Sequence, residues 1–244
     1  YDRTPGRASR LAARKAAACA VAFENSPLPN ATVTGAPVRQ EILRLDRVAD
    51  RAAARQRLGI PTDRFLVAVM GGSLGSGVLN AEIARYVEDR RNDEAVAVRQ
   101  VAGERFVADI DELGTIADGI IHQVVGYEAD MPGVYAAADL MIGRGGASTV
   151  HEVAVTGIPS ILVPWSGAAD DHQTDNVRWL SEVGGAVLMS EADLGGLGTE
   201  IDRLRNDLAA RDALSTAARE RGEVHRSGAL AELIEHVALT SATS

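Results

Sequence analysis

The 244-residue sequence predicts an α/β fold built on an open parallel sheet. Six short apolar segments have the length of strands, helix-like segments separate most of them, and glycine-rich turns directly follow two of them. Uninterrupted apolar runs are typical of strands that are covered on both faces. Strands that alternate with helices form doubly wound sheets, so we expect a Rossmann-like arrangement.

The expected elements follow one another regularly after a different N-terminal region. Ala, Leu, Arg and Lys favour a helix over 6–18, and residues 32–39 are typical of a β-like step and a linker. Gly59 and Pro61 end the next helix, over 46–58. The expected strands are 65–70, 95–102, 120–125, 140–142, 160–163 and 186–189, and the helices between them are 78–90, 131–138, 148–156 and 175–183. One or two further helices are expected in the last fifty residues.

Composition excludes several partners and sites. The 25 Lys and Arg against 34 Asp and Glu give a net charge of −9, which argues against nucleic acid or an anionic membrane as the partner of the whole chain. A basic stretch from Arg3 to Lys15 is the local exception. The single cysteine, Cys19, excludes a disulfide framework and a cysteine-rich zinc site, and fits a reducing, cytoplasmic setting. No apolar run has the length of a membrane span.

The first glycine cluster follows the first strand of the predicted sheet and precedes a helix. Gly71, Gly72 and Gly75 allow close approach of the backbone, and Ser73 and Ser76 can donate hydroxyls. A helix N-terminus at this edge of a sheet favours phosphate. The spacing matches neither the dinucleotide-binding fingerprint nor the Walker A loop, which disfavours a nicotinamide dehydrogenase and a P-loop ATPase. The alternative is a tight turn that binds no ligand.

A second glycine cluster, residues 143–149, follows the fourth strand and opens another helix, with Ser148 or Thr149 as the expected cap. Two such turns on one sheet face the same crevice, which suggests a nucleotide with its phosphates across two helix N-termini. Glu152 follows three residues after Thr149. Taken alone, this spacing favours a capping box. The alternative is a carboxylate that accepts both hydroxyls of a ribose.

A third group of candidate residues lies in the polar stretch after the fifth strand, which we expect to be a long loop. Asp170, Asp171 and His172 invite comparison with a metal site, but no Glu or Cys completes a convincing ligand set, and we expect no metal. No serine lies in a nucleophile elbow, so a hydrolase triad is disfavoured. The amide and imidazole groups of Gln173 and His172 suit sugar hydroxyls better. The alternative is a solvated loop.

Together, these clusters resemble the donor domain of the MurG-like glycosyltransferases, family 28 of the GT-B enzymes. The resemblance covers roughly residues 33–190. It rests on five motifs in compatible order: Thr34 to Arg39, Gly71 to Ser76, Tyr127 with Met131, Arg144 to Glu152, and Asp170 to Asn176. It implies one half of a GT-B enzyme that holds UDP-N-acetylglucosamine and needs no cofactor.

The resemblance also implies roles for individual residues. Arg39 and Ser73 are expected beside the diphosphate, and Glu152 at the ribose. Gln173, with His172 beside it, is expected at the N-acetylglucosamine. The backbone of Glu128, in the segment from Tyr127 to Met131, is expected at the uracil. The other residues expected in the site are Gly72, Gly75, Arg144, Gly146, Ala147, Ser148, Thr149 and Asn176.

The acceptor half of such an enzyme is not recognisable here. The family's G-G-T-G-G-H loop is absent and the sequence starts at Tyr1 rather than Met, so we expect either a piece of a longer protein or a natural truncation, with no assignable catalytic base. Residues 1–36 would be the end of the acceptor domain and its linker. Residues 37–244 would be the donor domain, with a last helix that crosses back to the acceptor side. This chain alone is expected to be insufficient for transfer.

The resemblance implies that the intact enzyme is cytoplasmic and peripheral on the inner face of the cell membrane. There it would transfer N-acetylglucosamine, with inversion, to an undecaprenyl-pyrophosphoryl muramyl-pentapeptide in peptidoglycan synthesis. Two alternatives remain open: a related GT-B enzyme with another acceptor, and a noncatalytic module that binds nucleotide sugars.

Overall fold

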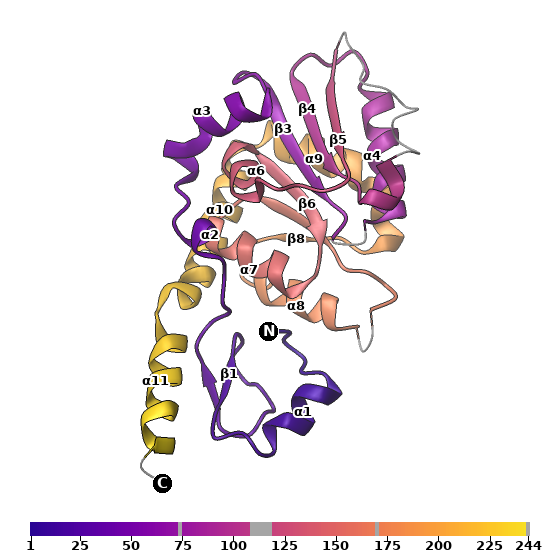
Figure 1. The fold of residues 1–244 in the computed structure, drawn as a ribbon. Helices are drawn as coiled ribbons and strands as arrows, with labels where there is room; N and C mark the ends of the chain where they lie inside the picture. The colour runs from indigo at the N-terminus through magenta and orange to yellow at the C-terminus, as the bar shows by residue number, and fades with distance from the viewer. Residues whose placement is uncertain (73–74, 108–118, 169–170, 243–244) are drawn as a thin grey trace.

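A computed structural model of the chain describes residues 1–72, 75–107, 119–168 and 171–242. Its main sheet has six parallel strands in the order β5-β4-β3-β6-β7-β8, as Figure 1 shows. The predicted fold class is confirmed. The strands are β3 (Phe65–Met70), β4 (Val96–Val101), β5 (Ile121–Val125), β6 (Leu140–Arg144), β7 (Ser160–Val163) and β8 (Val187–Leu188).

The strand order places a switch point between β3 and β6. The chain runs outward from β3 through β4 to β5, then returns to the other side of β3 and continues through β6, β7 and β8. Met70 pairs with Gly143 at the last position of the β3–β6 ladder. The turns that follow these two strands therefore leave the sheet side by side. This is the place where open α/β sheets bind ligands.

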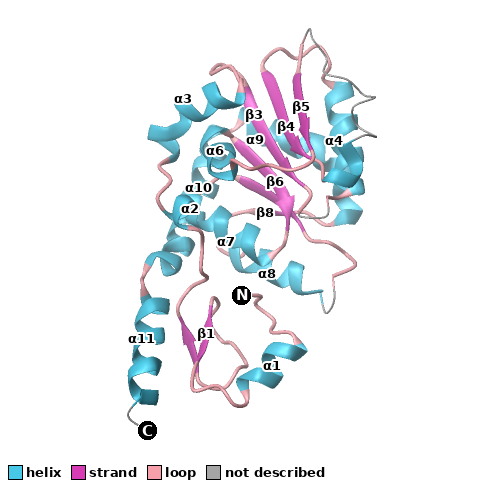
Figure 2. Cartoon of the chain, in the orientation of Figure 1, coloured by secondary structure: helices cyan, strands magenta, loops and turns pink. Residues whose placement is uncertain are grey.

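Helices cover both faces of the sheet, as Figure 2 shows. Alternate residues of a strand point to opposite faces, so Leu66 and Ala68 join one buried cluster while Val67 and Val69 join the other. The first cluster is closed by α3 (Arg47–Leu58), α6 (Met131–Ala137), α7 (Ala147–Thr156) and α8 (His172–Ser181). The second is closed by α4 (Gly77–Asp89) and α9 (Leu197–Asn206), while α10 (Leu208–Gly222) contributes to both.

Arginines of α3 fasten the helices that carry the site. Arg47 donates to the backbone carbonyls of Tyr135, Ala138 and Gly157, at the ends of α6 and α7. Arg55 is fully buried and donates to the backbone carbonyl of Ala137, at the end of α6, at 3.0 Å. Since a helix leaves its last carbonyls without intrahelical partners, these guanidinium groups both satisfy them and fix the helix positions.

The N-terminal region, called the N-terminal unit below, forms a small sheet of its own. It contains α1 (Arg7–Ala13), β1 (Cys19–Val21) and β2 (Ala31–Val33), and the two strands pair in parallel. The helix expected over 6–18 is too long, because it ends at Ala13 and two tight turns follow. Tertiary pairing of Cys19–Val21 with the linker outweighs the helical preference of the alanines that precede it.

The C-terminal region has more helices than expected. Two 3₁₀ helices, η3 (Glu191–Gly196) and η4 (Glu223–Arg226), accompany α9, α10 and α11 (Ala229–Ala242). The expectation of one or two helices is wrong because Asp207 caps a new helix through the N–H of Ala210, which separates α9 from α10. The elements α2 (Gln40–Leu43) and η1 (Glu104–Phe106) were also not expected.

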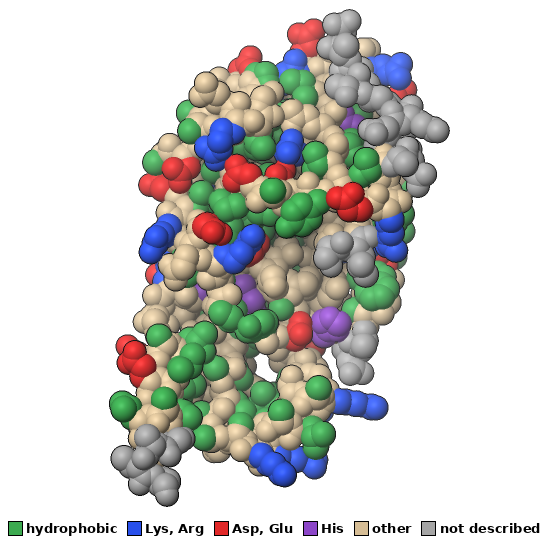
Figure 3. Space-filling model, viewed as in Figure 1, with side chains coloured by type: hydrophobic (Ala, Val, Ile, Leu, Met, Phe, Trp, Pro, Cys, Tyr) green, Lys and Arg blue, Asp and Glu red, His purple; other side chains and the backbone are tan. Residues whose placement is uncertain are grey.

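The last helix extends away from the sheet, toward the same end of the molecule as the N-terminal unit (Figure 1). Figure 3 shows apolar side chains gathered over these two parts. Exposed apolar residues there include Leu11, Val33, Ile234 and Leu239. The expected domain boundary near residue 36 stays a prediction. Within the residues described, no helix is long and apolar enough to cross a membrane.

Candidate functional site

The first glycine turn joins β3 to α4 at the C-terminal edge of the sheet, as predicted. Gly72 and Gly75 have φ values of 83° and 68°, a region that favours glycine. A Cβ on Gly75 would lie 2.2 Å from the carbonyl oxygen of Ala102. The turn therefore needs glycine at this position both for its backbone and for its contact with the end of β4.

The structure describes one of the two serines of this turn. Ser76 is the N-cap residue of α4, and its hydroxyl accepts the N–H of Leu79 at 3.4 Å. The same hydroxyl accepts a hydrogen bond from Arg144 at 2.6 Å, which ties the first turn to the end of β6. Ser73, which the resemblance implies beside a diphosphate, lies outside the described residues.

The second glycine turn opens α7 one step earlier than expected. Gly146 is the N-cap residue, and no side chain among the described residues bonds to the first-turn amides. The expected cap by Ser148 or Thr149 is therefore wrong, because both residues already lie inside the helix. The first N–H groups of a helix have no intrahelical partner, and the positive end of the helix dipole lies with them. In α7, the first N–H groups and the positive end of the helix dipole remain open to a ligand.

A cavity of about 1000 Å³ lies between the two turns. This is the upper end of the usual range for ligand pockets. The expected site residues that line it are Gly72, Gly75, Arg144, Gly146, Ala147, Ser148, Thr149, His172 and Gln173. The structure thus brings together residues from β3, β6 and β7 and their following segments, which are far apart in the sequence.

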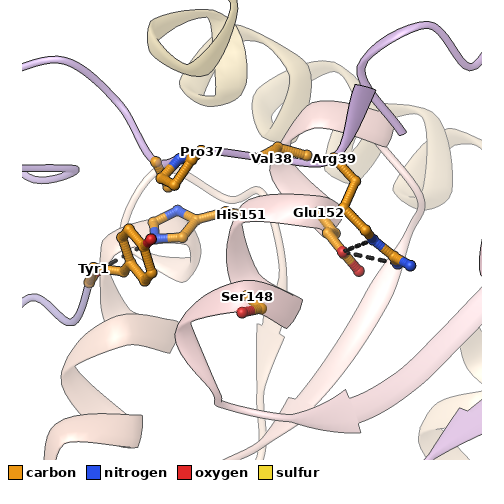
Figure 4. A pocket seen from close by; sticks show the side chains of 8 residues that line it. Tyr1, Pro37, Val38, Arg39, Ser148, His151 and Glu152 are labelled. Atoms are coloured by element: carbon orange, nitrogen blue, oxygen red, sulfur yellow. Dashed lines mark hydrogen bonds and ion pairs between the residues drawn. The ribbon is translucent and has the colours of Figure 1, made fainter. Parts of the chain in front are cut away.

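A smaller cavity of about 300 Å³ lies next to the first. Ser148 borders both, so α7 forms their common wall. The smaller cavity is lined by Arg39 from the linker and by His151 and Glu152 from α7. In Figure 4, Arg39 and Glu152 point toward each other at one end of it.

Glu152 is held by side chains rather than by the backbone. Its Oε2 accepts a hydrogen bond from the Tyr135 hydroxyl at 2.8 Å. Its Oε1 accepts from Nη2 and Nε of Arg39, at 3.0 and 3.2 Å. The capping box predicted with Thr149 does not form, because α7 starts at Ala147 and Glu152 lies in its second turn. The side chain of Glu152 is 13% exposed and borders the smaller cavity.

Comparison with known proteins decides the family. Residues 66–229 match the glycosyltransferase family 28 C-terminal domain. The chain belongs to glycosyltransferase family 28. The match starts within β3 and runs into the first residue of α11, so it contains both glycine turns and Glu152.

Relatives of this family 28 chain agree with that assignment. It is 38% identical, over 88% of its length, to a UDP-N-acetylglucosamine–N-acetylmuramyl-(pentapeptide) pyrophosphoryl-undecaprenol N-acetylglucosamine transferase of Salinibacter ruber. It is 34% identical, over 95% of its length, to the protein of the same name from Clavibacter michiganensis. The chain spans about three fifths of these relatives, 58% and 62% of their lengths. A crystal structure of Acinetobacter baumannii MurG superposes with a TM-score of 0.72 at 25% identity, over 96% of this chain and 63% of that one.

In this family 28 domain, Arg144 is committed to neighbouring protein groups. It forms an ion pair with Glu191 at 2.7 Å and donates to the carbonyl of Val163 at 3.3 Å. Burial of Glu191 opposes its ionisation, but hydrogen bonds from Ser166 and Arg144 outweigh that effect and lower its pKa. Arg144 therefore fixes the walls of the larger cavity, and whether it also touches a ligand stays a prediction.

The polar stretch after β7 is helical from His172, so the loop expected as far as residue 176 is shorter than predicted. Gln173 lies in the first turn of α8, and its Oε1 accepts the N–H of Trp165 at 3.0 Å. His172, Gln173 and Trp165 all line the larger cavity. Asp170 lies outside the described residues.

The segment after β5 lies apart from both cavities. Tyr127 is 74% exposed, and Met131 is buried at the start of α6. The Glu128 carboxylate pairs with Arg99 at 2.6 Å and accepts the N–H of Asp130. Because this side chain is engaged, only the backbone of Glu128 is open to the expected contact with a base, which stays a prediction.

Asn176 connects α8 to residues near the N-terminus and to the second glycine turn. It is fully buried, and its amide donates to Asp2 at 2.9 Å and to the carbonyl of Gly145 at 3.3 Å. Its carbonyl accepts the N–H of Arg3 at 2.8 Å. Asn176 therefore links α8 to the N-terminal unit and lines neither cavity, and its expected contact with a ligand stays a prediction.

Sequence reasoning assigned no role in the site to Trp165, Glu191 or Tyr135. The first two follow the fifth and sixth strands, where side chains at the sheet edge reach the ligand crevice, so the rule that located the glycine turns could have found them. Tyr135 gives no such signal, because an aromatic residue in an apolar helix is typical of a core position.

Proposed function

We propose that this chain is the donor-binding half of an enzyme that transfers N-acetylglucosamine from UDP-N-acetylglucosamine to a lipid-linked muramyl-pentapeptide. The relatives at 34% and 38% identity carry the name of this activity. The observation that carries the proposal is the pair of cavities at the N-terminus of α7, with open amides in the larger one and a held carboxylate in the smaller one.

The two cavities suit different parts of the donor. The first-turn amides of α7 and the N-terminus of α4 favour the diphosphate, since both offer N–H groups at a positive helix end. Glu152 is a hydrogen-bond acceptor of the kind that a ribose diol requires. Gln173 and His172, at the wall of the larger cavity, would contact the sugar. The uracil would lie against the backbone at Glu128.

The proposed reaction is a direct displacement with inversion. A hydroxyl of the acceptor attacks the anomeric carbon of N-acetylglucosamine, the bond from that carbon to the diphosphate oxygen breaks, and UDP leaves. The helix N-termini, and Arg39 once it turns from Glu152, would stabilise the charge that develops on the diphosphate. The base that takes the acceptor proton is assigned to no residue of this chain. The enzyme would work at the inner face of the cell membrane, where a lipid-linked acceptor lies.

Titration calorimetry with UDP and UDP-N-acetylglucosamine tests donor binding. We expect both to bind, and Glu152→Ala to lower the affinity about tenfold or more, because hydrogen bonds to a charged group contribute about 1.5–3 kcal/mol each. Glu200→Ala is the matched control: this glutamate of α9 is similarly buried, at 20% exposed, and within the described part of the chain it forms an ion pair with Arg203 alone. A folded chain that binds neither nucleotide, or equal affinities in the parent and Glu152→Ala, would contradict the proposal.

A further inference from the structure

The two oxygens of the Glu152 carboxylate have partners of different mobility. Oε2 is bonded to Tyr135, which is fully buried in the core between α3, α6 and α7. Oε1 is bonded to Arg39, whose side chain is 50% exposed. An exposed arginine is easily displaced, since ion pairs of exposed side chains contribute little in water. A ligand can therefore compete for Oε1, whereas Oε2 stays occupied.

Tyr135 is well suited to hold that inner oxygen. Burial, together with the neighbouring charge of Glu152, raises the pKa of the tyrosine well above its ordinary value. The hydroxyl therefore keeps its proton and can only act as a donor toward the carboxylate. The backbone of Tyr135 is fixed as well, because its carbonyl accepts a hydrogen bond from Arg47 at 2.9 Å.

We propose that Tyr135 is a positioning residue for nucleotide recognition. Its hydroxyl binds Oε2 of Glu152 and thereby presents Oε1 to the hydroxyls of a ribose in the smaller cavity. Tyr135 lines neither cavity itself, so it acts only through Glu152. This inference rests on the proposed function, because it assumes that Glu152 binds a ribose.

The test compares UDP with 2′,3′-dideoxy-UDP, which lacks the hydroxyls that Glu152 would bind. In Tyr135→Phe we expect UDP to bind at least about tenfold more weakly, the effect of losing one hydrogen bond to a charged group, while the dideoxy nucleotide binds as it does to the parent. The matched control is Tyr86→Phe. Tyr86 is also buried and its hydroxyl also contacts a carboxylate, that of Asp202 at 3.4 Å, but on the opposite face of the sheet.

Equal losses for both nucleotides in Tyr135→Phe would assign the tyrosine a purely structural role and overturn the inference. Affinities for both nucleotides that are unchanged in Tyr135→Phe would overturn it too, while the proposed function would stand. A parent chain that binds no UDP would overturn the proposed function and the role of Tyr135 with it.

A second comparison holds even where Tyr135→Phe folds poorly alone. Tyr135→Phe leaves the charged Glu152 carboxylate without the hydroxyl that donates to Oε2. Combining it with Glu152→Gln removes that charge. Because Tyr135 acts only through the carboxylate, the double variant should bind UDP as Glu152→Gln does, within about twofold. A further loss of about fivefold or more in the double variant would contradict the proposal.

Discussion

Mild acid should destabilise this protein through two buried histidines where the linker meets α7. His225 Nδ1 accepts the N–H of Ala36 at 2.9 Å, so the neutral ring carries its proton on Nε2. That nitrogen lies 3.1 Å from His151 Nδ1, which must then be the acceptor. His151 consequently donates from Nε2 to the carbonyl of Tyr1 at 3.3 Å. A proton added to His151 would set its Nδ1–H against the Nε2–H of His225. A proton added to His225 would set its Nδ1–H against the N–H of Ala36.

The pKa values give the direction and the size of the effect. Burial, followed by the neighbouring His225, lowers the pKa of His151 to about 3, and burial, followed by Arg226, lowers that of His225 to about 4. An unfolded histidine titrates near pH 6.5. The unfolded chain therefore binds more protons than the folded chain. The contribution of the two histidines to stability is fully present above about pH 6.5 and is lost as the pH falls toward about 4. The pair should contribute a slope of about 2 kcal/mol per pH unit in this window.

Urea unfolding at several pH values between about 7.5 and 4.5 measures this slope. A third histidine, His122, also has a pKa lowered by burial to about 4, so the pair is isolated by a variant. His225→Gln keeps an acceptor and a donor but cannot titrate, and its acid slope should be shallower by about 1 kcal/mol per pH unit. His236→Gln, at an exposed position of α11, is the control. The same slope in the parent and His225→Gln would refute the reasoning.

Three further predictions concern the scaffold and the site. Asp139→Asn should lower the free energy of unfolding in urea by about 3 kcal/mol, because it leaves the fully buried guanidinium of Arg55 without its counter-charge; a loss below about 1 kcal/mol would contradict this account of the core. Gly75→Ala should cost about 2 kcal/mol or more in a melting experiment and weaken UDP binding, since a Cβ at this positive-φ position meets the carbonyl of Ala102; wild-type stability would show that the turn tolerates a side chain. Arg39→Ala should weaken UDP more than uridine in calorimetry, because its proposed partner is phosphate; equal losses would exclude that role.

The strands of the sheet could be predicted from the sequence because they are buried on both faces. Phe65–Met70 and Ser160–Val163 occupy the expected residues, since their ends coincide with the ends of apolar runs. Local preference fails where tertiary contacts decide. The alanines after Ala13 are good helix formers, yet the chain turns there and enters a strand. The start of α8 at His172 was missed because its first turn is polar and shows no apolar periodicity.

The site was predictable in its location but not in its contacts. Glycines after two parallel strands indicate a shared crevice, and the larger cavity lies there. The contacts of Glu152 join residues 17 and 113 positions away in the sequence, Tyr135 and Arg39, and no local pattern encodes them. For the same reason the bonds of Asn176 to Asp2 and Arg3, more than 170 positions away in the sequence, could not be predicted.

A crystal structure of the chain with UDP-N-acetylglucosamine tests the central claim most directly. The account predicts the ribose hydroxyls within hydrogen-bond distance of Glu152 Oε1, with Oε2 still bonded to Tyr135. It also predicts the diphosphate against the first-turn amides of α7, between the two glycine turns. A nucleotide bound with its ribose away from Glu152, or with its phosphates outside the larger cavity, would contradict it.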